Sequence, residues 1–129
     1  MALPARILIV DDEQPIADLL SHTFEQEGHV IARAHDGIDC MNKMAGFRPD
    51  VVIMDIMMPR LDGVEATRLI RRNRAYQGTL IIALSAKADT DTRKQMHQAG
   101  ADAFVRKPFV IARLVERVGD MLSSRMGMK

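Results

Sequence analysis

One carboxylate closes the apolar stretch Val51-Val52-Ile53-Met54-Asp55. Pro49-Asp50 precede this stretch, and Pro59 and Gly63 punctuate the segment that follows it. The length of the run and its flanking residues predict a strand that is buried on both faces, as in a parallel sheet. Asp55 would then lie at the carboxyl end of that strand, where open α/β sheets keep their ligands.

On either side of this stretch, short apolar runs alternate with segments of helical periodicity. The expected strands cover residues 6–10, 30–32, 51–55, 79–84 and 103–105, and the expected helices cover 15–27, 38–45, 64–73, 90–99 and 111–122. Strict alternation predicts a parallel sheet with helices on both faces, because each crossover must be a helix-length, right-handed return. We therefore expect a single α/β domain over residues 1–129, a doubly wound five-stranded parallel sheet with its core at about 5–122 and a frayed tail at 123–129.

The composition narrows the class of protein. Eighteen basic and 17 acidic residues leave a net charge of +1, which gives no overall field to attract nucleic acid. The lone Cys40 cannot form an internal disulfide, which favours a reducing compartment, the cytoplasm. The apolar runs are far shorter than the roughly 20 residues that span a bilayer, so we expect no membrane partner. We interpret the basic cluster at Arg68, Arg71, Arg72 and Arg74 as the solvated end of a helix.

Polar residues follow four of the predicted strands: Asp11-Asp12, Asp55, Ser85 and Lys107. Because the carboxyl ends of parallel strands share one rim, these side chains should converge there. Three close carboxylates would repel one another, and at least one would stay protonated unless a cation neutralises them. Oxygen ligands without His or Cys favour Mg²⁺ as that cation. A carboxylate is a competent nucleophile for phosphoryl transfer, and an ammonium and a hydroxyl can stabilise the transferred group. The sequence therefore predicts a Mg²⁺-assisted phosphoryl-transfer site at Asp55.

The same residues carry a family resemblance. The chain resembles, over essentially its full length, the receiver domain of bacterial two-component response regulators. The resemblance rests on Ile7-Leu8-Ile9-Val10-Asp11-Asp12, on Asp50-Val51-Val52-Ile53-Met54-Asp55-Ile56-Met57-Met58-Pro59 with Asp62-Gly63, on Ala83-Leu84-Ser85-Ala86, and on Gly100-Ala101-Asp102 with Lys107-Pro108-Phe109. It implies a flavodoxin-like three-layer sandwich with strand order 2-1-3-4-5 and the function of a phosphoryl-accepting signalling switch in a two-component phosphorelay.

The resemblance also implies roles for the rim residues. Asp55 would accept the phosphoryl group from a sensor histidine kinase or a phosphotransfer protein. Asp11, Asp12, Asp55 and the backbone carbonyl of Met57 would hold Mg²⁺. Lys107 would pair with the phosphoryl oxygens. The only catalysis expected is the chain's own autophosphorylation from phosphodonors and its autodephosphorylation.

The resemblance further implies a conformational switch. Ser85 would bond to the phosphoryl group and Phe104 would change rotamer in response, while Lys107-Pro108 would form a cis peptide. The output surface would be the fourth helix, fifth strand and fifth helix. The downstream protein or fused effector is left open, as is a homodimer formed on phosphorylation.

The chain departs from the commoner family pattern at four positions. Ser85 replaces Thr and keeps the hydroxyl, whereas Phe104 replaces Tyr and loses one. Met57, two residues past the acceptor, offers no amide or carboxylate to orient a hydrolytic water, and Lys87, two past Ser85, can crowd or bond the phosphate. We predict from Met57 and Lys87 that self-dephosphorylation is slow.

Two other classes of function compete with the switch. A Mg²⁺-dependent phosphohydrolase could use Asp55 as nucleophile, but such enzymes usually carry an acid where this chain has Met57. A flavin-binding electron carrier has a similar topology. The start at Met1 favours an N-terminal position for the domain, and either a stand-alone receiver or part of a longer regulator or hybrid kinase fits the sequence.

Overall fold

The computed structural model describes residues 4–87 and 89–125. Over this part of the chain, strands and helices alternate as predicted. The strands are β1 (Arg6–Val10), β2 (Val30–Ala34), β3 (Val51–Asp55), β4 (Leu80–Ser85) and β5 (Ala103–Arg106). The helices are α1 (Gln14–Gln26), α2 (Gly37–Phe47), α3 (Gly63–Arg72), the short 3₁₀ helix η1 (Arg74–Tyr76), α4 (Thr90–Ala99) and α5 (Ile111–Arg125). Within these residues, no helix is long and apolar enough to cross a bilayer.

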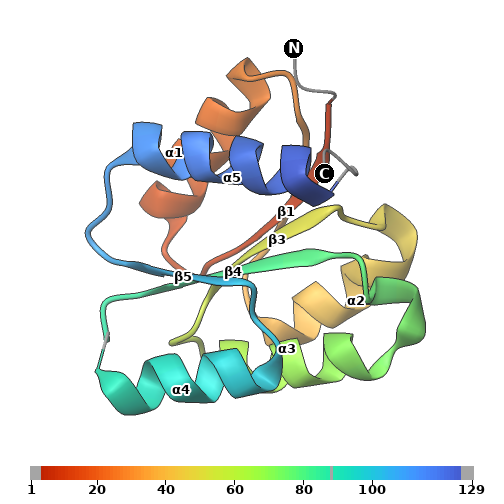
Figure 1. Ribbon diagram of the computed structural model, residues 1–129, viewed down its shortest axis with the longest axis vertical. Coiled ribbons are helices and arrows are strands. Elements are labelled where there is room, and N and C mark those ends of the chain that lie inside the picture. The colour runs from red at the N-terminus through yellow and green to blue at the C-terminus, as the bar shows by residue number, and fades with distance from the viewer. Residues whose placement is uncertain (1–3, 88, 126–129) are drawn as a thin grey trace.

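The strands form one parallel sheet in the order β2-β1-β3-β4-β5. Helices α1 and α5 cover one face of the sheet, and α2, α3 and α4 cover the other (Figure 1). The predicted doubly wound, flavodoxin-like three-layer fold is confirmed. Because all five strands run the same way, their carboxyl ends lie along one rim, and this rim carries the candidate site.

The central strand β3 is buried on both faces, which explains why its sequence is apolar at consecutive positions. Val51 and Ile53 pack in the core under α1 and α5, whereas Val52 and Met54 pack in the core under α2 and α3. All four side chains are at most 1% exposed. Side chains alternate between the two faces of a strand, so a central strand of a parallel sheet needs both sets to be apolar.

Two helices extend further than the sequence indicated. Helix α2 continues through Gly46, which is exposed, and ends at Phe47 because Arg48 adopts a left-handed backbone (φ 54°). Helix α5 continues to Arg125, so residues 123–125 are not a frayed tail. The Arg125 guanidinium donates a hydrogen bond to the Gly78 carbonyl (2.8 Å) and pairs with Asp50 (3.2 Å), and these contacts anchor the last turn. The rest of the predicted tail, 126–129, lies outside the described residues.

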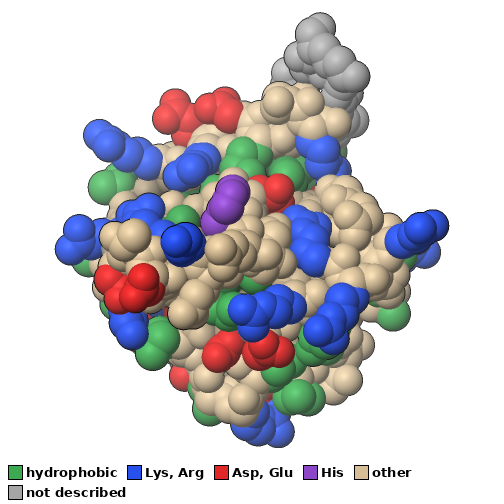
Figure 2. Space-filling view, turned by 60° about the horizontal axis from the view of Figure 1, so that its bottom comes forward, with side chains coloured by type: hydrophobic (Ala, Val, Ile, Leu, Met, Phe, Trp, Pro, Cys, Tyr) green, Lys and Arg blue, Asp and Glu red, His purple; other side chains and the backbone are tan. Residues whose placement is uncertain are grey.

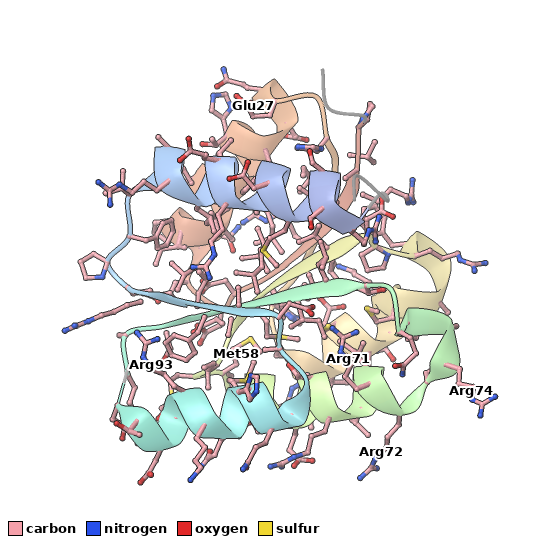
Figure 3. The ribbon with its side chains drawn as sticks, viewed as in Figure 1. Glu27, Met58, Arg71, Arg72, Arg74 and Arg93 are labelled. Atoms are coloured by element: carbon pink, nitrogen blue, oxygen red, sulfur yellow. The ribbon has the colours of Figure 1, made fainter. Side chains whose placement is uncertain are left out.

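The interpretation of the basic cluster is wrong for Arg71. Arg72 and Arg74 are exposed and point away from the fold, but the Arg71 side chain is only 17% exposed and turns inward (Figure 3). Its guanidinium donates to the carbonyl oxygens of Gly100 (2.9 Å) and Tyr76 (2.8 Å), and to the carboxylate of Asp102 (2.8 Å). Arg71 therefore ties α3 to the η1 helix and to the turn between α4 and β5.

Arg71→Ala is expected to lower the free energy of unfolding by about 2–4 kcal/mol, because it removes a largely buried charged donor from two carbonyls and a carboxylate. Urea unfolding followed by circular dichroism measures this loss. Arg72→Ala is the matched control and should cost about 0.5 kcal/mol or less, since Arg72 is exposed. Equal losses in the two variants would contradict the structural role of Arg71.

Candidate functional site

Three carboxylates meet at the rim of the sheet. Asp11 and Asp12 follow β1, and Asp55 is the last residue of β3. Each offers one carboxylate oxygen, and these oxygens all lie within 4.8 Å of one another. Asp11 and Asp55 are each 3% exposed, whereas Asp12 is open to solvent. The site is therefore a small acidic pocket with two buried walls and one exposed edge.

Lys107, which follows β5, supplies the positive charge of this pocket. Its Nζ lies 3.2 Å from Asp11 Oδ2 and 3.6 Å from Asp55 Oδ2. It also donates to Glu13 Oε1 at 3.0 Å. Partial burial lowers the pKa of Lys107, but the bond to Glu13 and the charges of Asp55 and Asp11 outweigh it and raise the pKa above its usual value. Sequence reasoning missed Glu13 as a site residue, although it directly follows the Asp11-Asp12 pair.

The electrostatics of the pocket leave negative charge incompletely balanced. Burial, with the neighbouring charge of Asp11, raises the pKa of Asp55 to about 7, while Lys107 opposes this rise. Burial also raises the pKa of Asp11, against the hydrogen bond from the Glu13 amide. One ammonium does not balance three carboxylates, so the pocket can hold a further cation. All the side-chain donors are hard oxygens, which suits a divalent ion such as Mg²⁺ rather than zinc.

The loop after β3 is fastened beside the acidic pocket. The Met57 amide donates to Asp55 Oδ1 (3.3 Å), and the exposed Met57 side chain points to solvent. Further along the loop, Arg60 has a left-handed backbone (φ 65°), and its guanidinium binds the buried carboxylate of Asp36. The Gly37 amide donates to the Leu61 carbonyl (3.1 Å). These contacts tie the Met57 loop to the start of α2, and no local pattern in the sequence points to Asp36 or Arg60.

Ser85 lies at the end of β4, next to the strand that carries Asp55. It is fully buried, and its Oγ accepts a hydrogen bond from the Lys87 amide (3.0 Å). A serine hydroxyl that accepts one bond can still donate another. The Ser85 carbonyl accepts from the Lys107 amide (2.8 Å), and the Lys107–Pro108 peptide is cis. The backbone thus links Ser85 and Lys107, while the exposed Lys87 side chain lies two residues away.

Phe104 lies apart from the acidic pocket, on the α4 side of the sheet. In the β4–β5 register it pairs with Ala83, two residues before Ser85. Its side chain is half-buried against the apolar cluster that includes Ile56 and Met96, and the guanidinium carbon of Arg93 lies 4.5 Å from the ring centroid. The structure therefore connects Phe104 to the strand that carries Ser85.

Comparison with known proteins decides the family. Residues 7–119 match the family described as the response regulator receiver domain. The chain belongs to this receiver family. The response regulator MprA of Mycobacterium sp. (strain KMS) is 35% identical over 120 residues, which cover 93% of this chain and 51% of that protein. The receiver thus spans about half the length of the curated relatives it matches.

Solved receiver structures agree with this assignment. The chemotaxis response regulator CheY4 of Vibrio cholerae has a TM-score of 0.86 and 28% identity, with 93% of this chain and 99% of that chain covered. A BeF3-activated DrrB receiver domain has a TM-score of 0.85 and 30% identity, with 94% and 99% covered. Residues 7–119 therefore form a phosphoryl-accepting receiver unit, a signalling switch of two-component systems. Family membership decides against the phosphohydrolase and the flavin carrier.

Proposed function

We propose that Asp55 is the residue that accepts the phosphoryl group, and that a sensor histidine kinase or a phosphotransfer protein donates it. The observation that carries this proposal is the convergence of Asp11, Asp12 and Lys107 on the Asp55 carboxylate. Of the two buried carboxylates, Asp55 occupies the end of the central strand. Its Oδ1 also receives the Met57 amide, which fixes the carboxylate plane.

The transfer is a displacement at phosphorus. An oxygen of the ionised Asp55 carboxylate attacks the phosphorus of a phosphohistidine, the P–N bond breaks, and the imidazole nitrogen leaves with the electron pair and takes up a proton. The product is an acyl phosphate on Asp55. Lys107 Nζ, 3.6 Å from Asp55 Oδ2, is placed to pair with a phosphoryl oxygen, and the Ser85 hydroxyl can donate to another.

Asp11, Asp12, Asp55 and the backbone carbonyl of Met57 would hold Mg²⁺ in this pocket. When bound, the ion would supply positive charge that allows the buried carboxylates to ionise together and that offsets the charge of the incoming phosphoryl group. The oxygen-only donor set fits the ion. The contact of Arg60 with Asp36 holds the loop that carries Met57, which supports a fixed backbone ligand there.

Phosphorylation would then act on the face formed by α4, β5 and α5. The phosphoryl group adds charge and acceptor oxygens, which would draw the Ser85 hydroxyl toward it. Movement of Ser85 along β4 would alter the packing of Phe104, the half-buried aromatic on the neighbouring strand. We place this switch in the cytoplasm, as one receiver unit over residues 1–129 whose effector, fused or separate, reads the altered face.

Reductive trapping tests the assignment of the acceptor. The purified chain is incubated with acetyl phosphate and Mg²⁺, the acyl phosphate is reduced with borohydride, and the modified residue is located by peptide mass spectrometry. We expect the mass of a single phosphoryl group on the intact chain and the reduced residue at position 55, both absent when EDTA replaces Mg²⁺. Modification at Asp11 or Asp12 instead of Asp55 would refute the assignment.

Met57→Asn is expected to speed loss of the phosphoryl group by about 10-fold, because an amide at this exposed position can orient the attacking water. The decay of phosphorylated protein after removal of acetyl phosphate measures the rate. Met57→Leu, which offers no hydrogen-bonding group, should decay like the natural chain. Equal decay rates for the Asn and Leu variants would remove the argument for slow dephosphorylation.

A further inference from the structure

Two adjoining hollows lie on either side of Phe104, on the surface formed by α4, β5 and α5. Their volumes are about 260 and about 300 Å³, and both are lined by Phe104 and Arg117. The first lies toward α4, and the second toward the start of α5. Most of the polar side chains that line them are basic: Arg93, His97, Arg106, Arg113 and Arg117. We call this surface the arginine face.

The charge of the arginine face is not balanced by the residues that line it. Asp102 is the one carboxylate among the lining residues, and it is already engaged. It accepts the Arg71 guanidinium and the Ile81 amide, each at 2.8 Å. The protein as a whole carries only +1, so this face concentrates positive charge that is compensated elsewhere. On the side of the molecule that includes α4, Lys and Arg side chains lie among hydrophobic, Asp and Glu side chains (Figure 2).

Apolar groups lie between the basic side chains. The Phe104 ring is half-buried beneath the Arg93 guanidinium, and Val110 is 60% exposed at the rim of the second hollow. Leu114 is buried in the wall of the same hollow. A surface with an apolar centre and an unbalanced charged rim has the organisation of a protein-binding site.

We propose that the arginine face binds an acidic protein segment that inserts a large apolar side chain beside Phe104 and places its carboxylates against Arg113 and Arg117. The inference extends the proposed function, because it gives the chemical class of the partner that reads the output surface. The negative charge of such a segment complements the positive charge of the arginine face. The planar guanidinium groups favour carboxylates, with which they form paired hydrogen bonds.

A second copy of this chain fits the arginine face poorly. In a symmetric dimer the same patch lies on both subunits, so a dimer built on this face would bring two surfaces of like charge together. Nucleic acid also fits less well, since the chain lacks the strong net positive charge typical of nucleic-acid-binding domains, and the hollows have apolar walls. Both occupants are nevertheless outcomes of the test below.

The test uses fluorescence anisotropy with the full chain and a labelled synthetic peptide, rich in Glu and carrying a Leu-Leu-Phe cluster. The matched peptide has Gln at every Glu position. We expect the acidic peptide to bind at least about 5-fold more tightly than the Gln peptide at low salt, and the difference to shrink as salt rises. The double charge reversal Arg113→Glu with Arg117→Glu should remove the preference for the acidic peptide.

The control is the double reversal Arg72→Glu with Arg74→Glu, which changes the net charge equally at exposed positions outside the hollows. It should keep the preference, and circular dichroism checks that both variants fold. Equal binding of the two peptides overturns the proposal. So does tighter binding of an oligonucleotide that depends on Arg113 and Arg117, or a phosphorylated dimer that their reversal dissociates.

The peptide experiment is independent of the acceptor assignment. It is carried out on unphosphorylated protein, and Asp55→Asn should bind the acidic peptide as the natural chain does. If Asp55 is labelled but the acidic peptide binds no more tightly than the Gln peptide, only the proposal of an acidic partner is rejected. Retained preference with labelling at another residue would reject only the acceptor.

Discussion

Asp55→Asn is expected to lower labelling by acetyl phosphate at least about 100-fold, because the amide keeps the shape of the side chain but removes the nucleophilic carboxylate. The carbonyl oxygen of the introduced side-chain amide can still accept a hydrogen bond from the Met57 backbone, so the loop should hold its place. Asp62→Asn is the matched control: Asp62 caps α3 outside the pocket, and Asn is an equally good cap. Labelling that persists in Asp55→Asn would mean that another residue accepts the group.

The same variant has a second signature in stability. Burial raises the folded-state pKa of Asp55 to about 7, above its unfolded value near 3.8. As the pH rises, Asp55 therefore loses its proton in the unfolded chain before it does so in the folded chain. The free energy of unfolding of the natural chain falls as the pH rises from about 4 to about 7, and it has lost the whole contribution of Asp55 above that range. In EDTA, Asp55→Asn should therefore be more stable than the natural chain above pH 7, with the difference vanishing toward pH 4. Parallel urea unfolding curves at both pH values measure it.

The fold and the outline of the site could be predicted because both depend on local pattern. Four consecutive apolar residues before Asp55 require a strand buried on both faces, and alternation with helices makes the strands parallel. A parallel sheet then places Asp11, Asp55 and Lys107 on one rim without knowledge of any contact. The strand order came from the family resemblance, because periodicity alone does not say which strands are neighbours.

The contacts that could not be predicted join residues that are distant along the chain and have no local signature. Arg71 meets Asp102 across 31 positions, and Arg60 meets Asp36 across 24. In the sequence Arg71 stands in a cluster of helix-end arginines and differs from Arg72 only in which way it faces. Whether a cation is solvated or buried depends on the neighbouring elements, which a helical pattern does not specify.

Glu13 shows the same limit inside the site. The sequence places Glu13 in the acidic loop after β1. Its contact with Lys107 depends on where β5 ends relative to that loop, which the sequence does not specify. The structure gives Lys107 three carboxylate neighbours, and two of them, Asp11 and Asp55, belong to the acidic pocket. Lys107 therefore lies between the acidic pocket and the solvent-exposed Glu13. We expect that replacing Lys107 changes the rate of phosphoryl transfer without weakening the binding of Mg²⁺.

Lys107→Met is expected to slow phosphoryl transfer by about 100-fold while leaving Mg²⁺ affinity equal or tighter. Methionine keeps much of the length of the side chain and loses the ammonium that would stabilise the phosphoryl oxygens. It also removes a cation that competes with Mg²⁺ for Asp11 and Asp55, so metal binding should not weaken. Initial labelling rates at saturating Mg²⁺ measure the first effect, and calorimetric titration of unphosphorylated protein measures the second.

Lys94→Met, an equivalent change on the exposed side of α4, is the control and should alter neither quantity. A labelling rate within about 3-fold of the natural chain would contradict a role for the ammonium in the transfer, since loss of a single stabilising donor typically costs far more. Weaker Mg²⁺ binding together with slower transfer would show instead that Lys107 shapes the pocket. The predicted separation of the two effects follows from the position of Lys107. Its Nζ lies near two carboxylates of the acidic pocket, Asp11 and Asp55, and is also held by Glu13 outside the pocket.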